Sequence, residues 1–494
     1  MATANFRVQE WSISGRDFFL DVGAPRRTGL RRRIEDGLRE AIRSGRLRHG
    51  ALLPPTRALA RDLGVSRGTV VQAYVQLAAE GWITGLQGSG TRVAVRHELL
   101  PLSKQAGESR ERWRFDFRHG RPDPSSFPRR EWLRASRHAL ARMSDAAFDY
   151  GGPEGHLELR LELAAYLSRA RGLRVEAPQL IVTTGFTQGL GLVGRALAAS
   201  GVRRVAIEEP SMALHRMILR SAGLELVLLA VDDRGARIEE LERADVGAVV
   251  LTPNRQHPTG VLLAPERRAA LLEWARSTGG LVIEDDYDGE FRYDRRPIGP
   301  LQGLDPNSVV YGGTTSKTLA PGLRLGWLVL PEAIHPRVRR EKALADWHSS
   351  TIEQLALAEL LRSGDYDRHV RKMRLRYRRR RDILVQTLQD LGRDLDISGT
   401  AAGLNLLIRL AGPATEREAI ASANAAGIGL GGLVRDAFYE RAACGGLVVG
   451  YAAAPEHTFA EATAALAQVI ATLPPRKRPF GVAYDLPRAG ALTT

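Results

Sequence analysis

Apolar residues recur at helical spacing near the N-terminus of the chain. From residue 30 the pattern places an apolar residue on one helix face about every fourth position, at Leu30, Ile34, Leu38 and Ile42. Arginines occupy the opposite face, and the predicted helix should end near Gly45. The spacing therefore predicts one amphipathic helix that packs by its apolar face.

Two shorter helices are predicted in the following segment, residues 52–94. Thr56 is a candidate N-cap for a helix that ends at Gly64, and Ser66 is a candidate N-cap for the next one. The inner face of this later helix is apolar and consists of Val70, Ala73, Tyr74 and Leu77. Because Gly64 supplies a turn between the two helices, the pair is typical of a helix-turn-helix.

The later helix carries polar residues on its outer side, near its N-terminal end. These residues are Arg67, Thr69 and Gln72. A recognition helix meets base edges with this end, and phosphates also favour the positive end of a helix. The pattern therefore favours DNA binding.

A small hairpin is predicted directly after these helices. Residues 82–84 and 91–93 form two short strands around Gly85, Gly88 and Gly90. Such a hairpin would be a wing that contacts the minor groove or the DNA backbone. From periodicity alone, the alternative is three surface helices and a hairpin that bind no nucleic acid.

Beyond residue 114, short β-branched runs alternate with longer helical stretches. The candidate buried strands are 180–183, 204–207, 247–251, 281–284, 308–311 and 326–330. Helical segments separate several of them, near residues 187–200, 212–222 and 265–277. The alternation predicts an α/β domain with a mostly parallel sheet, in which ligands bind at the carboxyl ends of the strands.

The bulk composition is that of a globular protein with several domains. The 494 residues are 44% hydrophobic and 26% charged, which is enough to bury a large core. The net charge of +15 suggests an anionic partner, and residues 1–100 alone hold 16 Lys+Arg against 9 Asp+Glu. The single cysteine, Cys444, excludes an intrachain disulfide and fits a reducing compartment. Because no secretory signal or membrane-length apolar run is found, we expect a cytoplasmic protein without membrane contact, and no motif predicts a metal site.

Candidate ligand-binding residues follow the predicted strands. Gly185, Phe186 and Thr187 open a helix whose free amides could hold a phosphate, although such glycines often serve turn geometry only. Asp285 and Tyr287 share one face of a strand, so an acid and a phenol should point into the same site. Buried acids at strand ends are uncommon without a partner.

A lysine follows the next strand, at the end of the segment GGTTSK, residues 312–317. Burial lowers the pKa of a lysine and makes it a nucleophile, and aldehyde cofactors are trapped by such lysines. Pyridoxal phosphate also needs an acid at its pyridine nitrogen and a phosphate site, for which Arg324 offers a planar fork of donors. A lone Ser-Lys is usually a surface lysine, and a lone Asp a surface acid. The order of these elements on successive strand ends favours the cofactor.

The N-terminal segment resembles the GntR type of winged helix. The resemblance covers about residues 28–94 and rests on the segments 53–57, 63–70, 79–81 and 88–91. It implies double-stranded operator DNA as a partner, and Pro55-Thr56 stands where the family usually has two serines. The loss of a serine there could remove a phosphate hydrogen bond without changing the fold. The expected DNA-binding residues are Arg57, Ser66, Arg67, Thr69, Gln72, Gly88, Ser89 and Thr91.

The rest of the chain resembles the aminotransferases of fold type I. Together with the winged helix it resembles the MocR group of regulators, over residues 28–472 and with the segment IEDDYDGEFRY, 283–293. The resemblance implies a mostly parallel large domain and a smaller C-terminal α/β domain. The expected boundaries are 24–95 for the winged helix, 96–113 for a linker, 114–474 for the aminotransferase-like domain and 475–494 for a flexible tail.

The resemblance also implies a role for each cofactor contact. Lys317 would form the Schiff base, Asp285 would pair with the pyridinium nitrogen, and Tyr287 would pair with the ring hydroxyl. Tyr150 would reach the phosphate of the cofactor in the other subunit, which implies a homodimer. The full set of expected cofactor contacts is Lys317, Asp285, Tyr287, Thr314, Arg324, Gly185, Phe186, Thr187, Tyr150, Met212 and His257.

Three positions depart from the aminotransferase pattern. Met212 stands where an aromatic residue usually stacks on the pyridine, and a thioether packs there more loosely. His257 replaces an asparagine or an aromatic residue, and it could approach the ring hydroxyl or merely fill space. The late strand at 446–451 contains no arginine to grip a substrate carboxylate, for which Arg216 and Arg435 are the substitutes to consider.

Residues 371–381 hold eight basic residues in eleven. Met373 and Tyr377 still indicate a packed helix face, so a solvated helix is the default interpretation. Accessory contact with DNA phosphates is the alternative.

The sequence supports three functional hypotheses. The first is a transcription regulator whose aminotransferase-like domain senses pyridoxal phosphate, or its adduct with a small amino compound, and thereby changes DNA binding. The missing late-strand arginine favours the cofactor itself as the signal. The second is an active aminotransferase that carries an accessory DNA-binding domain. The third is a DNA-binding scaffold whose large domain no longer holds a cofactor.

Overall fold

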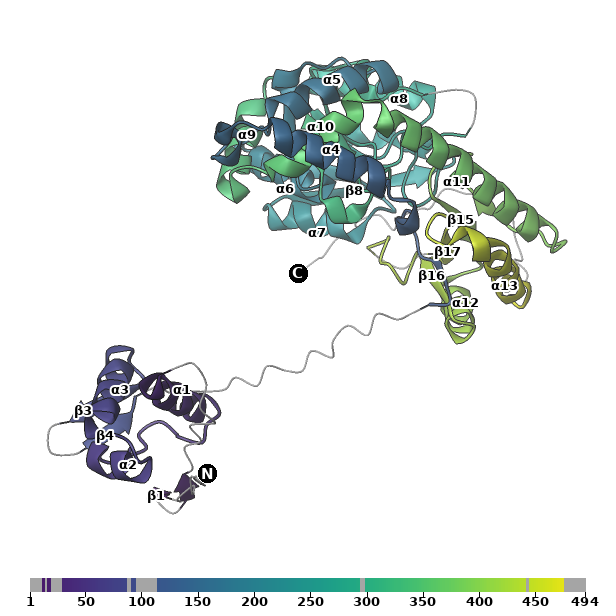
Figure 1. Cartoon of the computed structure of the whole chain (residues 1–494). Helices are drawn as coiled ribbons and strands as arrows, with labels where there is room; N and C mark the ends of the chain where they lie inside the picture. Colours follow the sequence, from purple (N-terminus) through teal and green to yellow (C-terminus); the bar gives the residue numbers. More distant parts are fainter. Residues whose placement is uncertain are drawn as a thin grey trace, which may run out of the picture. The chain divides into compact units, whose positions relative to one another are not determined.

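The computed structural model describes residues 11–13, 16–18, 29–86, 90–94, 113–293, 298–440 and 444–474 (Figure 1). The chain divides into two compact units, residues 1–111 and 112–494. Apart from Trp113, the predicted linker and the predicted tail lie outside the described residues.

The first unit, as far as it is described, holds three helices and two antiparallel strand pairs. Its elements are β1 (Trp11–Ile13), β2 (Arg16–Phe18), α1 (Leu30–Arg43), α2 (Thr56–Asp62), α3 (Arg67–Ala79), β3 (Ile83–Leu86) and β4 (Gly90–Val93). The predicted apolar faces of α1 and α3 meet in one core that includes Ile34, Leu38, Val70 and Leu77. The predicted wing is present, because β3 and β4 pair antiparallel with Ile83 opposite Val93.

The helix caps in this unit correct one prediction. Thr56 is the first residue of α2 rather than its N-cap, which is Pro55 and makes no side-chain cap bond. The extended backbone at Pro55 leaves Thr56 already inside the helix. Ser66 is the N-cap of α3 as predicted, and its Oγ accepts the backbone N–H of Thr69 at 3.2 Å.

The second unit is built on an eight-stranded sheet in the order β6-β13-β12-β11-β10-β7-β8-β9. These strands are β6 (Leu180–Thr183), β7 (Arg204–Glu209), β8 (Glu225–Asp232), β9 (Gly235–Ala236), β10 (Ala248–Leu251), β11 (Leu281–Asp285), β12 (Val309–Thr314) and β13 (Gly326–Val329). The strands from β12 to β8 run parallel, while β13 is antiparallel to both of its neighbours. The sheet is therefore mostly parallel, as predicted. The prediction missed β8, whose continuous run ELVLLAVD does not distinguish a strand from a buried helix.

Helices cover both faces of this sheet. They are α4 (Arg129–Arg142), α5 (Leu157–Arg171), α6 (Phe186–Ala199), α7 (Ala213–Ser221), α8 (Pro265–Thr278), α9 (His335–Asp346) and α10 (Thr351–Arg362). In β6, Ile181 packs into the core with α6, whereas Leu180 and Val182 pack into the core with α5 and α10. This alternation is why a strand buried on both faces is apolar throughout.

A smaller five-stranded sheet follows in the order β14-β15-β17-β16-β5. Its strands and helices are β5 (Phe115–Phe117), β14 (Ile397–Ser398), β15 (Asn405–Arg409), β16 (Ile428–Gly432), β17 (Gly446–Gly450), α11 (Asp365–Gln389), α12 (Pro413–Ala425) and α13 (Phe459–Ala471). Figure 1 shows α12 and α13 beside this sheet, with α11 reaching it from the large sheet. β5 is the first strand of the unit in sequence, yet it pairs with β16 near the C-terminus.

The basic run at 371–381 lies within α11. Met373 and Tyr377 are buried as predicted, and five of the eight basic residues of the run are exposed. Arg380 is buried and ion-paired with Asp123 and Glu456.

In the part of the chain that the structure describes, no helix is both long and apolar enough to span a membrane.

Candidate functional site

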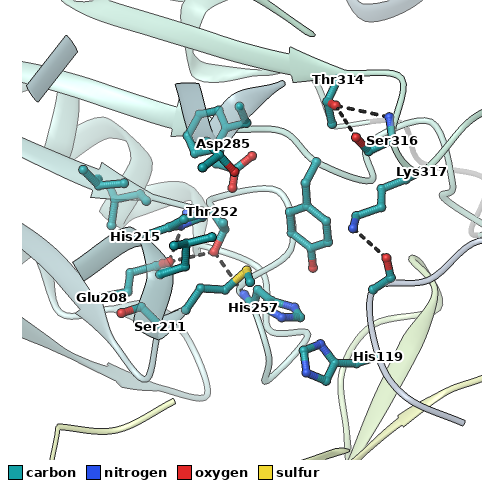
Figure 2. Close-up of a pocket in the computed structure, with 18 of the residues that line it drawn as sticks. His119, Glu208, Ser211, His215, Thr252, His257, Asp285, Thr314, Ser316 and Lys317 are labelled. Atoms are coloured by element: carbon teal, nitrogen blue, oxygen red, sulfur yellow. Dashed lines mark hydrogen bonds between the residues drawn. The ribbon is translucent and has the colours of Figure 1, made fainter. Parts of the chain in front are cut away.

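A cavity of about 320 Å³ lies where the carboxyl ends of the parallel strands meet (Figure 2). Its walls come from the ends of β7, β10, β11 and β12, from the start of α6 and α7, and from the segment after β5. This edge is where ligands bind in open α/β sheets. Nine of the predicted cofactor contacts line it: Phe186, Thr187, Met212, His257, Asp285, Tyr287, Thr314, Lys317 and Arg324.

Lys317 lies in the turn after β12 and points into the cavity. Its Nζ donates a hydrogen bond to the carbonyl of Gly120, at 2.6 Å. Burial lowers the pKa of the Lys317 ammonium, while the nearby Asp285 and Asp288 carboxylates oppose that shift. An amine with a lowered pKa reaches its neutral, nucleophilic form more easily.

Asp285 is the last residue of β11 and provides the test of whether a pyridine ring fits here. Its Oδ1 is buried and has no hydrogen-bond partner among the described residues. Burial raises the pKa of Asp285 well above its usual range, against the attraction of Lys317. A buried carboxylate without a partner is costly, so a cationic N–H donor in the cavity would satisfy it. The pyridinium nitrogen of pyridoxal phosphate is such a donor.

The opposite end of the cavity suits an anion. At Gly185, with φ of +97°, a Cβ would lie 3.1 Å from a guanidinium nitrogen of Arg324, so glycine lets the guanidinium approach the start of α6. The first N–H groups of a helix have no partner inside it, and here they belong to Phe186 and Thr187. Thr314 Oγ1 lies 3.0 Å from Ser316 Oγ at the same wall. These groups could hold a phosphate.

The two unusual residues of the predicted site also face the cavity. His257 is buried and its Nδ1 has no partner among the described residues. Its ring centroid lies 5.3 Å from that of Tyr287, and burial lowers the pKa of the imidazole well below its usual value. His257 is therefore a neutral ring beside the phenol, and both of its suggested roles stay open. Met212 precedes α7 and packs against a small core that contains Phe438.

Tyr150 and the two candidate arginines lie elsewhere. Tyr150 is 83% exposed and is not among the residues that line this cavity. Arg216 lines no part of it either, because its buried guanidinium donates to the backbone carbonyls of Ser211, Ala437 and Phe438 and pairs with Glu440. A carboxylate would have to displace these contacts, so Arg216 is not a substrate clamp. Arg435 is exposed in the segment after β16.

Several cavity residues were missed by the sequence analysis. His119 and Gly120 follow β5, and His119 Nε2 lies 3.2 Å from Asp436 Oδ2. Glu208 accepts hydrogen bonds from the N–H and hydroxyl of Thr252, and burial raises its pKa to about 7. Burial lowers the pKa of His215 to about 4. For His119 and Gly120, the only signal in the sequence was a polar turn after a short apolar strand.

Six of the eight predicted DNA-binding residues are among the described residues of the first unit. Arg57 on α2 and Arg67 and Gln72 on α3 are exposed. The hydroxyls of Ser66 and Thr69 are 2.8 Å apart, so part of their hydrogen-bonding capacity serves the helix cap. Thr91 lies in β4, whereas Gly88 and Ser89 are outside the described residues.

Pyridoxal phosphate, when bound, supplies an aldehyde that condenses with amines and a ring that withdraws electrons from the amine attached in this way. The residues here fit that group: an amine at Lys317, an acid at Asp285 and an anion site near Arg324. The described residues contain no cluster of His, Cys, Asp or Glu that could hold a metal ion.

Comparison with known families agrees with this division. Residues 30–93 match the bacterial regulatory proteins of the gntR family, and residues 120–428 match aminotransferase class I and II. The fold and the site thus define a GntR-type DNA-binding domain joined to an aminotransferase-like domain whose cofactor is pyridoxal phosphate.

Relatives with both parts are regulators. The chain is 33% identical to the uncharacterized HTH-type transcriptional regulator YhdI of Bacillus subtilis, over 88% of this chain and 93% of that protein. It is 32% identical to the probable rhizopine catabolism regulatory protein MocR of Rhizobium meliloti, covering 87% and 92% of the two chains. It is 34% identical to the pyridoxine biosynthesis transcriptional regulator PdxR of Corynebacterium glutamicum, covering 74% and 80%. The chain belongs to the MocR-type family of GntR transcription regulators.

Solved structures agree for the second unit. A kynurenine aminotransferase from Pyrococcus horikoshii superposes with a TM-score of 0.65 at 25% identity, covering 72% of this chain and 90% of that one. An archaeal alanine:glyoxylate aminotransferase has the same TM-score and coverage at 27% identity.

Proposed function

We propose that this regulator senses pyridoxal phosphate through the cavity around Lys317 and converts its binding into a change in operator affinity. The observation that supports this most directly is Asp285, whose buried Oδ1 has no partner among the described residues and faces the cavity that Lys317 enters. The amine of Lys317 and the acid of Asp285 suit the aldehyde and the pyridine nitrogen of the cofactor, and the winged helix suits DNA.

Each predicted contact keeps its proposed role. Lys317 holds the aldehyde carbon, Asp285 the pyridinium nitrogen and Tyr287 the ring oxygen. Thr314, Arg324 and the backbone of residues 185–187 hold the phosphate. Met212 and His257 contact the ring.

We propose that the cofactor itself is the signal, rather than its adduct with an amino acid. An α-amino acid needs a cation for its carboxylate, and Arg216 is already bound to backbone carbonyls. Arg324 is the only arginine among the described residues that line the cavity, and it lies at the end proposed to bind the phosphate. An amino compound without a carboxylate remains the alternative effector.

The active protein is proposed to be a homodimer that acts in the cytoplasm on double-stranded DNA. Large apolar side chains are exposed on α4, on α5 and on the segment between them, which is unusual for a surface that meets only water. They are Leu133, Leu140, Phe148, Tyr150, Leu157 and Leu161. In this dimer Tyr150 would reach the cofactor of the other protomer. The proposed boundaries stay at 24–95, 96–113, 114–474 and 475–494.

The test is DNA binding by the full chain. An operator is first selected from random double-stranded DNA, and its Kd is then measured with and without pyridoxal phosphate. We expect the cofactor to change Kd by about fivefold or more, within the usual range for coupled sites. Lys317→Ala should abolish the change, whereas Lys372→Ala, which removes an exposed lysine on α11, should preserve it.

Three results would contradict the proposal. If Lys317→Ala keeps the full cofactor response, the cavity is not the sensor. If wild-type protein transaminates amino acids and Lys317→Ala loses only that activity, the accessory-domain aminotransferase is the better description. Wild-type protein that never acquires the visible absorbance of bound cofactor would support the scaffold.

A further inference from the structure

Arg255 is a buried arginine beside the cavity for which the proposed function has no use. It lies in the turn after β10, and its side chain is only 3% exposed. Burying a guanidinium is costly unless the group is paired and hydrogen-bonded, so its contacts indicate why it is there.

Three residues hold the guanidinium. Nη1 donates to the hydroxyl of Tyr287 at 2.8 Å and lies 3.1 Å from Asp288 Oδ2. Nη2 donates to the backbone carbonyl of Asn405, the first residue of β15. Arg255 therefore connects a phenol of the cavity wall to the smaller sheet.

The backbone around Arg255 is shaped to admit it. At Gly403, with φ of +76°, a Cβ would fall 2.6 Å from Arg255 Cζ. At Gly260, with φ of +73°, a Cβ would lie 3.4 Å from Nη2. Glycines occupy both positions, where a side chain would be strained and would meet the guanidinium.

These contacts decide what the hydroxyl of Tyr287 can do. A phenol has one O–H donor and two acceptor sites, whereas a guanidinium can only donate. The Tyr287 oxygen therefore accepts from Arg255, and the Tyr287 proton remains available to another acceptor. Asp288 is one such acceptor, since its side chain also hydrogen-bonds to Tyr287, but the same carboxylate is ion-paired with Arg255 Nη1 at 3.1 Å, so the guanidinium competes with the phenol for it. Tyr287 lines the cavity, so a bound ligand can receive the proton there.

We propose that Arg255 is a positioning residue for the cofactor: it donates to the Tyr287 oxygen, neutralises Asp288, and so directs the phenol proton to the ring oxygen of pyridoxal phosphate. The inference rests on the proposed cofactor binding. Burial raises the pKa of Tyr287 well above its usual value, and the charge of Arg255 opposes this shift, which makes the phenol a better donor.

The expected consequence is spectroscopic. A hydrogen bond donated to the ring oxygen favours its deprotonated form, so losing that bond should move the pH-dependent absorbance transition of the bound cofactor upward. We expect a shift of about one pH unit, the size of one hydrogen bond to an ionised oxygen. The other ionisable groups that line this cavity are the same in every variant: His119, Glu208, His215, His257, Asp285, Lys317 and Arg324.

The experiment compares full-length Arg255→Met, Tyr287→Phe and the double variant, each loaded with pyridoxal phosphate. Both single variants should shift the transition upward. The double variant should shift it no further than Tyr287→Phe alone, because Arg255 acts through that hydroxyl. Arg255→Lys should shift the transition less than Arg255→Met does, since an ammonium also donates to the phenol and pairs with Asp288.

Arg255→Met leaves Asp288 buried without a counter-charge, so this variant could fail to fold. Arg255→Met with Asp288→Asn removes the stranded charge and should show the upward shift in a folded protein, as judged by circular dichroism.

The inference would be overturned if a folded Arg255 variant kept the absorbance transition at the wild-type pH. It would also be overturned if the shift in the double variant equalled the sum of the two single shifts. These failures are distinct from failure of the proposed function, in which wild-type protein takes up no pyridoxal phosphate. That last result would overturn both proposals.

Discussion

At the scale of single residues, the cavity holds ionisable groups in states that water would not favour. Burial raises the pKa of Asp285 well above its usual range and lowers that of Lys317. The charge of each group opposes the pKa shift of the other, so the pKa values of both depend on how deeply the site buries them. Glu208 shares the cavity wall and has no cationic partner among the factors that set its pKa.

We predict that the stability of the folded protein depends on pH through Glu208. The pKa of this carboxyl is about 7 in the folded protein against 4.5 as its ordinary value, because it is buried. Between these values the folded state binds a proton that the unfolded state has lost. The stabilisation is thus fully present below about pH 4.5 and is lost as the pH rises through about 7.

Glu208→Gln should weaken this dependence, because an amide does not titrate. Thermal unfolding measured in steps from about pH 5 to pH 8 should show a melting temperature that falls less in the variant than in the wild type. Part of the fall should persist, since burial also raises the pKa values of Glu284 and Glu290 to about 7. Equal slopes for the two proteins would contradict the prediction.

At the scale of elements, helix ends supply the positions that contact ligands. α6 begins at the anion end of the cavity, and α3 begins at the exposed Arg67 after its Ser66 cap. In both cases a cation lies at the start of the helix, Arg324 beside Gly185 at α6 and Arg67 itself at α3. We expect the two helix starts to bind anions by the same principle, each in its own unit.

We predict that Arg67→Ala weakens operator binding by about ten- to a hundredfold, because one base-reading arginine is worth roughly 1–3 kcal/mol. Electrophoretic or fluorescence titration with the selected operator measures this loss. Repeating the selection with the variant should return sites with relaxed preference at one position. Arg203→Ala, which removes an exposed arginine of the second unit, is the matched control. An unchanged Kd for Arg67→Ala would show that α3 does not read the bases.

At the scale of the whole molecule, the two units have separate cores. The core of the first unit is formed by α1, α2, α3 and the wing, and the cores of the second unit surround its two sheets. Coupling between cofactor and DNA therefore has to pass through the arrangement of the units or of two protomers.

We predict that the apolar surface on α4 and α5 forms the dimer interface. Leu161→Arg places a charge among these exposed side chains and should raise the dimer dissociation constant at least tenfold. Sedimentation velocity across a range of protein concentrations measures it. Leu375→Arg, on an exposed leucine of α11, should leave the dimer intact. A wild-type chain that stays monomeric at tens of micromolar would refute the dimer itself.

The local features of this protein could be predicted from neighbouring residues alone. The capped, amphipathic α3 and the apolar strands that end at Asp285 and Thr314 depend on neighbours a few residues away. The carboxyl ends of parallel strands meet at one edge of a sheet, so the meeting of several strand ends at one cavity was predictable. The local signal was weaker at β8, because its apolar run has no distinctive period.

Tertiary structure decided which groups each side chain meets. The Lys317 amine meets a carbonyl 197 residues away, at Gly120, and the Arg216 guanidinium meets one 222 residues away, at Phe438. Spacing along the chain carries no information about such pairs, because they are brought together by the packing of elements that are distant in sequence. For this reason the sequence left Arg216 as a candidate for binding a substrate carboxylate, whereas in the structure its guanidinium is bound to backbone carbonyls. For the same reason Arg255 was recognised as a residue of the proposed cofactor site only in the structure.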